Sequence, residues 1–165
     1  NLREDKHWAY GAISFLSSAK GQPPFVLYAP VQTDKTAQSV AEILQEAKGL
    51  IGDRPLTAQE ISKIKVSDVR SMPGSYQTTS AVMDALRDIT LYNRPDNYIQ
   101  TLKSRIDAQT DDAVRAAAHQ LVHPDQLTWV IVGDLKLIEA PVRALKLGEI
   151  HVLDADGKPV TEHGK

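Results

Sequence analysis

The stretch that decides our interpretation of the chain is N-L-R-E-D-K-H-W-A-Y-G-A, residues 1–12. The charged residues from Arg3 to Lys6 predict the end of a helix, and the apolar residues from Trp8 onward predict a strand. Arg3 and Tyr10 therefore lie seven positions apart across a helix-to-strand corner. Arginine offers five donors in a rigid fork, and tyrosine offers a phenolic hydroxyl on a stiff ring. Such a pair suits the binding of a peptide carbonyl or the stabilisation of an oxyanion.

The spacing of Arg3 and Tyr10 leaves a second interpretation open. Arg3 could be an exposed residue at a helix end, and Tyr10 an ordinary aromatic residue in a strand. Neither side chain is a good metal ligand. The neighbouring residues must therefore decide between a site and a plain surface.

These neighbours resemble a motif of the inverted zinc peptidases, the family of pitrilysin, insulysin and the mitochondrial processing peptidase. In bacterial-type members the C-terminal, non-zinc half carries N-L-R-E-x-K-G-x-x-Y-G-A. The chain matches it at Asn1, Leu2, Arg3, Glu4, Lys6, Tyr10, Gly11 and Ala12. His7 stands where the family usually has glycine, and we expect this difference to stiffen the corner.

The resemblance implies that Arg3 and Tyr10 reach the substrate across a closed chamber and that zinc is bound by an upstream half or a partner subunit. Both residues would be catalytic and both would bind substrate: Tyr10 would donate to the scissile carbonyl oxygen, and Arg3 would hold a neighbouring substrate carbonyl or carboxylate. The complete protein would be a zinc metalloendopeptidase, whereas this segment alone would bind no zinc and hydrolyse nothing. Bacterial members of the paired type are often exported, which implies a periplasmic location.

Composition restricts the remaining classes of function. The chain has 165 residues, of which 42% are hydrophobic and 24% charged, as expected for one soluble globular domain. A net charge of -2 offers no electrostatic footprint for nucleic acid or for an anionic membrane. The absence of cysteine excludes disulfide scaffolds and thiol catalysis. Because residue 1 already lies inside the motif, we expect residues 1–165 to be a single C-terminal domain taken from a longer chain.

Alternating and continuous apolar runs predict four strands, at residues 8–16, 25–32, 127–132 and 150–153. The first two should pair antiparallel across a polar connection at residues 17–24, and the third should be a central strand buried on both faces. Along the first strand, alternation places Tyr10, Ala12 and Ser14 on one face. The opposite face, with Ile13 and Phe15, should be core.

Capping residues and apolar residues at helical spacing predict the helices. These lie between Thr36 and Gly49, after the capping box of Thr57 and Glu60, near residues 82–92 and 99–106, after Thr110, and at residues 137–146. We interpret the apolar stripes on these helices as packing surfaces. The elements together predict an α+β fold with an antiparallel sheet and helices mainly on one face, which by resemblance is a processing-peptidase-like domain lacking its first strand and helix.

The other motifs indicate structure more than chemistry. The zinc motif H-x-x-E-H is absent, and His119 and His123 have no acid between them, so we interpret them as surface residues. Asp154 to Gly157 resembles the start of a calcium loop, but the remaining ligands are missing, which indicates a turn. The sequence contains no phosphate-binding loop and no nucleophile elbow.

Two alternatives to the peptidase remain at this point. The chain could be a non-proteolytic structural subunit of the same fold, although a scaffold does not need both Arg3 and Tyr10. It could also be an unrelated small binding domain. If the first strand and helix are absent, an open sheet edge with uncovered Ile13 and Phe15 should favour self-association.

Overall fold

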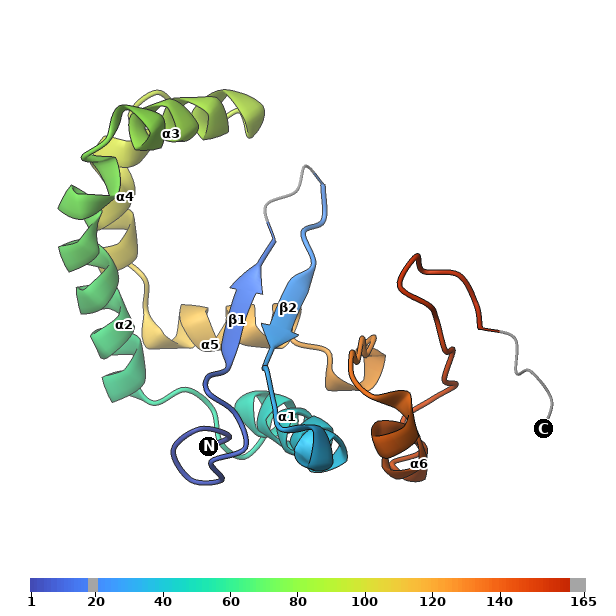
Figure 1. The fold of residues 1–165 in the computed structure, drawn as a ribbon. Helices are drawn as coiled ribbons and strands as arrows, with labels where there is room; N and C mark the ends of the chain where they lie inside the picture. The colour runs from blue at the N-terminus through green and yellow to red at the C-terminus, as the bar shows by residue number, and fades with distance from the viewer. Residues whose placement is uncertain (18–20, 161–165) are drawn as a thin grey trace. The chain divides into compact units, whose positions relative to one another are not determined.

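The computed structural model of the protein describes residues 1–17 and 21–160. This part of the chain contains six α-helices, three short 3-10 helices and a two-stranded antiparallel sheet, which confirms the α+β class (Figure 1). The strands are β1 (Ile13–Leu16) and β2 (Phe25–Tyr28). The helices are α1 (Thr36–Ile51), α2 (Ala58–Ser71), α3 (Thr79–Leu91), α4 (Tyr98–Asp107), α5 (Asp111–Leu121) and α6 (Leu135–Ala144). The 3-10 helices are η1 (Thr33–Lys35), η2 (Met72–Tyr76) and η3 (Pro124–Gln126).

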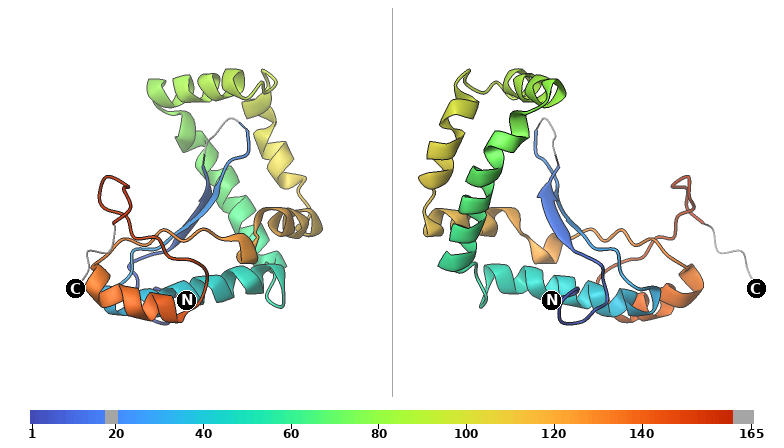
Figure 2. Two further views of the ribbon diagram at one scale, coloured as in Figure 1. Left: turned by 90° about the vertical axis from the view of Figure 1, so that its right-hand side faces the viewer. Right: turned by 60° about the vertical axis from the view of Figure 1, so that its left-hand side comes forward.

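Contacts within the chain define two compact units. The first consists of Asn1–Gly11, Ala29–Ile43 and Trp129–Lys165, and the second of Ala12–Tyr28 and Leu44–Thr128. In the first unit the buried apolar residues are Leu2, Ala37, Val40 and Ile138, and α6 packs against η1. In the second they are Ala47, Ile61 and Val122, and α2 packs alongside α4 and against α5 (Figure 2).

The hairpin of β1 and β2 confirms the predicted antiparallel pairing but is shorter than predicted. Continuous pairing extends from Ile13 opposite Tyr28 to Leu16 opposite Phe25. Beyond it the two predicted strands share an isolated bridge between Ala9 and Val31. Pro30 explains part of the gap, because proline has no backbone N–H to donate to a ladder. The connection at residues 17–24 includes residues 18–20, which lie outside the described part of the chain.

The alternation predicted from residue 8 to residue 16 is interrupted between Ala9 and Ile13. Four positions separate these two residues, but three separate their partners Val31 and Tyr28, so the first segment holds one extra residue. The regular strand therefore begins at Ile13, and the face that Tyr10 was predicted to share with Ser14 stays a prediction.

The predicted core face of β1 is exposed. Ile13 is 59% exposed and Phe15 is 45% exposed. The prediction of a buried face is therefore wrong, while the expected uncovered apolar residues are present. The stripe predicted on α3 is likewise exposed at Val82, Met83 and Leu86.

Helix α1 runs two residues past Gly49, where the sequence predicted its end. The glycine instead makes room for a side chain, because a Cβ at Gly49 would lie 2.6 Å from Nη2 of Arg54. Nη1 of Arg54 lies 3.3 Å from Oε2 of Glu46, so the guanidinium is held over the helix. Gly49 thus serves close packing and not helix termination.

The starts of α2 and α5 agree with the predicted caps. Thr57 and Glu60 form both bonds of the capping box at the start of α2, and the Thr110 hydroxyl accepts from the backbone N–H of Ala113 at the start of α5. Helix α6 begins at Leu135, two residues before the predicted position, because the carboxylate of Asp134 caps it. These caps act within three residues, which is why the sequence reveals them.

The predicted strands at residues 127–132 and 150–153 are wrong. Val130 is 85% exposed and Val132 is 95% exposed, and the described residues place no ladder along this segment. Near residue 150 there is only a bridge between Leu153 and Pro159. A strand needs a neighbouring strand for its backbone N–H and C=O groups, and apolar character alone does not supply one. No helix in residues 1–17 and 21–160 combines the length and apolar character needed to cross a membrane.

Candidate functional site

The first nine residues form one tight turn, and the predicted helix end is limited to that turn. The backbone N–H groups of Asp5 and Lys6 both donate to the carbonyl of Asn1, each at 3.0 Å. The backbone N–H of Trp8 then donates to the carbonyl of Leu2 at 2.9 Å. The Leu2 side chain is buried, with 6% of its surface exposed. The turn therefore folds back on itself and is anchored by one apolar side chain.

His7 explains why the turn does not continue as a helix. Its φ is +56°, in the left-handed region where a Cβ is disfavoured and glycine is preferred. Gln32 holds the chain at His7 and at the next residue. Its Nε2 donates to the carbonyl of His7 at 3.2 Å, and its backbone N–H donates to the carbonyl of Trp8 at 2.9 Å. The structure thus shows why glycine suits this position, and it shows histidine accepting the same geometry.

The turn brings Arg3 and Tyr10 together. The Cζ atom of Arg3 lies 5.7 Å from the centroid of the Tyr10 ring. Tyr10 is 89% exposed, and the Arg3 side chain is 63% exposed, with its Nε 3.2 Å from Oε1 of Glu4. At such exposure a cation–π contact contributes only about 0.5–1 kcal/mol. The phenol and the guanidinium therefore lie side by side in solvent, where both can reach a ligand.

Glu42 on α1, like Gln32, is a residue at this site that the sequence did not indicate. Its Oε1 accepts a hydrogen bond from Nδ2 of Asn1, and its Oε2 lies 3.7 Å from Nζ of Lys6. Nζ of Lys6 also lies 5.4 Å from the centroid of the Trp8 ring. No signal in the sequence could have linked Glu42 to the turn, because it lies 41 positions from Asn1 on a helix with many polar residues.

The two histidines weighed as metal ligands are both exposed. His119 lies in the last turn of α5, whereas His123 lies beyond Val122, the residue that ends this helix. They therefore do not share a helix face. Among residues 1–17 and 21–160, no three His, Asp or Glu side chains lie close enough together to hold a metal ion. The donor set of this part of the chain does not fit a zinc site.

The segment from Asp154 to Gly157 is a turn, as predicted. Oδ1 of Asp154 accepts from the backbone N–H groups of Asp156 and Lys158, both at 2.9 Å. Gly157 has a φ of +77°, which glycine adopts without strain. The carboxylate of Asp154 therefore satisfies the backbone of its own turn.

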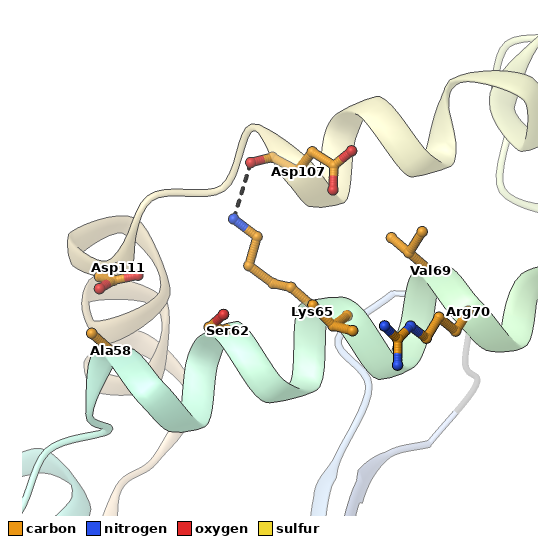
Figure 3. A pocket seen from close by; sticks show the side chains of 8 residues that line it. Ala58, Ser62, Lys65, Val69, Arg70, Asp107 and Asp111 are labelled. Carbon is orange, nitrogen blue, oxygen red and sulfur yellow. Dashed lines mark hydrogen bonds between the residues drawn. The ribbon is translucent and has the colours of Figure 1, made fainter.

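A hollow of about 640 Å³ lies along α2, beside the end of α4 and the start of α5 (Figure 3). Its charged lining has a structural explanation. Nζ of Lys65 donates to the backbone carbonyls of Asp107 and Gln109, at 3.0 and 2.7 Å, and so satisfies the C-terminal end of α4. The Asp107 carboxylate in turn pairs with Lys103, so two of the charged groups of this hollow already have partners on α4 and just after it, and the Arg3–Tyr10 pair remains the candidate site.

Comparison with protein families gives a match for the first part of the chain. A family model described as the peptidase M16 inactive domain matches residues 1–66. The match contains the turn, the hairpin, α1 and the first part of α2, and it confirms the resemblance to the non-zinc half of these metallopeptidases. No curated protein matches the chain.

Proposed function

We propose that the chain is the substrate-binding part of a zinc-dependent endopeptidase, because residues 1–66 match the family model of the peptidase M16 inactive domain. The observation that carries the proposal is the exposed Arg3–Tyr10 pair, 5.7 Å from guanidinium carbon to ring centroid. In this proposal the zinc belongs to another half of the protein or to a partner subunit, as the resemblance to the non-zinc half implies. The substrate is a peptide or an unfolded polypeptide.

Each member of the pair has a separate task in this proposal. Tyr10 donates its hydroxyl proton in a hydrogen bond to the scissile carbonyl oxygen as that oxygen gains negative charge. Arg3 holds a neighbouring substrate carbonyl or a carboxylate with its planar fork. A preorganised donor aimed at a developing oxyanion lowers the barrier by ~3 kcal/mol. Tyr10 is therefore the catalytic residue of this chain, and Arg3 acts through substrate binding.

Two further features of the complete protein belong to the proposal. A periplasmic location is proposed from the resemblance to bacterial members that are often exported, and cell fractionation tests it. Self-association is proposed from the exposed Ile13 and Phe15 on a hairpin with open edges, and sizing chromatography tests it.

The decisive experiment uses the chain combined with its zinc-bearing half, identified as the H-x-x-E-H protein encoded beside it or in the same polypeptide. In this complex Tyr10→Phe should lower kcat for peptide cleavage ~100-fold, because one donor is lost and the ring remains. Arg3→Lys should raise KM more than it lowers kcat, because an ammonium cannot reproduce the fork.

Tyr28→Phe is the matched control, since Tyr28 is a tyrosine with 58% exposure outside the pair. It should leave kcat and KM unchanged. Full activity of both Tyr10→Phe and Arg3→Lys would overturn the proposed function.

The description of the matched domain as inactive favours one alternative, a non-proteolytic structural subunit of the same fold. Such a subunit should form a stable complex whose peptide cleavage is undetectable with wild-type Arg3 and Tyr10. The family match of residues 1–66 speaks against an unrelated small binding domain.

A further inference from the structure

The turn that carries Arg3 has few sources of rigidity. Of the residues from Asn1 to Gly11, Leu2 alone is buried. The residues from Arg3 to His7 are all exposed, and the carbonyls of Asn1 and Leu2 accept the backbone hydrogen bonds that close the turn. A pair of exposed side chains can be preorganised only if the backbone beneath them is held from outside.

Glu42 on α1 holds the backbone of the turn in place, because its carboxylate contacts the turn both before and after Arg3. Oε1 accepts from the side-chain amide of Asn1, before Arg3, and Oε2 pairs with the ammonium of Lys6 at 3.7 Å, after Arg3. The Glu42 side chain is 15% exposed, and that of Lys6 is 39% exposed. A carboxylate removed this far from water needs partners, and here the two partners are the residues that bracket Arg3.

The hold continues toward Tyr10. The ammonium of Lys6 lies over the Trp8 ring, with Nζ 5.4 Å from its centroid. The Trp8 carbonyl accepts from the backbone N–H of Gln32 at 2.9 Å, two residues before Tyr10. The contact with Asn1 is therefore made two residues before Arg3, and the contacts through Lys6 reach Trp8, two residues before Tyr10.

We infer that Glu42 is a positioning residue, which holds the turn so that the guanidinium of Arg3 and the ring of Tyr10 face the same ligand. The inference rests on the proposed function for its purpose, while its geometry is independent of that function. It also gives Asn1 and Lys6 a task, since both are residues of the turn that bind one carboxylate.

The test compares Glu42→Ala and Glu42→Gln in the chain itself by NMR. Glu42→Ala should abolish the nuclear Overhauser contacts between Arg3 and the Tyr10 ring, and should speed exchange of the Lys6 and Trp8 amides roughly 5-fold, as expected for one lost hydrogen bond. Glu42→Gln keeps an acceptor for Asn1 but loses the charge facing Lys6, so its changes should be smaller. Glu46→Gln, one turn further along α1, is the control and should leave the pair unchanged.

A charge exchange separates positioning from general stability. Lys6→Glu combined with Glu42→Lys restores an ion pair of reversed sign, and the Asn1 amide can turn to present its oxygen. This double variant should regain the Arg3–Tyr10 contacts that either single variant loses. Loss of these contacts in both single variants without recovery in the double variant would overturn the inference.

The test of Glu42 as a positioning residue can fail or succeed independently of the test of the proposed function. If Glu42→Ala keeps the Arg3–Tyr10 contacts, the inference is overturned whatever the activity of the complex. If the contacts are lost in Glu42→Ala, but Tyr10→Phe and Arg3→Lys retain full activity, the positioning is supported and the proposed function is overturned. In an active complex, Glu42→Gln should raise KM and lower kcat together, because both members of the pair are displaced.

Discussion

Two glutamates each hold a bend of this chain, and they do so over very different distances in sequence. Oε2 of Glu60 accepts from the backbone N–H of Thr57 at 2.8 Å and from its hydroxyl at 2.7 Å, three positions away. Glu42 binds Asn1 at 41 positions and Lys6 at 36. The first bend starts helix α2, and the second carries the candidate site.

The two bends also differ in their surroundings. Glu60 is exposed, whereas the Glu42 side chain is 15% exposed. The capping box closes a bond pattern inside one turn of chain, so it forms wherever α2 forms. The contact of Glu42 exists only after α1 has folded against the turn. A bend held by neighbouring residues therefore forms with its helix and can be predicted from the sequence. A bend held by a residue far away in the sequence forms only with the tertiary structure.

The largest expected effect concerns the apolar anchor of the distant bend. Leu2→Ala should lower the free energy of unfolding by ~2–3 kcal/mol, because it deletes the buried side chain beneath the turn. Leu16→Ala is the matched control, since Leu16 is 48% exposed, and it should cost less than about 0.5 kcal/mol. Urea denaturation followed by circular dichroism measures both. Equal losses would mean that Glu42 and the backbone bonds hold the turn without help from Leu2.

The next effect concerns the local bend. Thr57→Ala should lower the free energy of unfolding by ~1 kcal/mol, because the N-cap oxygen is lost. The backbone N–H of Thr57, followed by its hydroxyl, lowers the pKa of Glu60 below its usual 4.5, against a small opposing effect of burial. The stability that Glu60 contributes is therefore present in full above pH 4.5 and is lost as the pH falls through the lower folded pKa.

This sign gives a direct check by denaturation at several pH values. Below pH 4.5, wild type should lose stability that Glu60→Gln does not lose, so the difference between the two should shrink as the pH falls. A difference that grows on acidification would contradict the cap as the cause of the lowered pKa.

The smallest effect concerns the backbone of the distant bend. His7→Gly should raise the free energy of unfolding by ~0.5 kcal/mol, because glycine adopts a φ of +56° without a Cβ clash, although it loses more backbone entropy on folding. Asn93→Gly is the comparison, since Asn93 has a φ of +50° and asparagine tolerates this region better. Its gain in thermal denaturation should be smaller. A loss of stability in His7→Gly would show that the imidazole itself supports the turn.

The residues of the site show how far sequence reasoning reached. The motif of residues 1–12 singled out Arg3 and Tyr10, and the structure brings these two side chains together. It did not single out Glu42 or Gln32, which hold the turn through contacts spanning 24 to 41 positions. Many residues of α1 are polar, and the sequence does not show that the carboxylate of Glu42 contacts the turn at Asn1 and Lys6.

The sequence by itself determined the features that act within a few residues. These include the capping box of Thr57 and Glu60, the cap at Thr110, the turn at Asp154 and the antiparallel pairing of β1 with β2. Each depends on bonds whose donors and acceptors are close neighbours or are joined by a short connection, so residue type and spacing suffice.

Only the tertiary structure decided what depends on contacts between distant residues. It left the apolar segment at residues 127–132 unpaired, because a strand forms only where another backbone meets its N–H and C=O groups. It continued α1 to Ile51 past Gly49, where the side chain of Arg54 packs close to the helix. It placed Glu42 between Asn1 and Lys6, because the folding of α1 against the turn removes its carboxylate from water, and its oxygens then need partners.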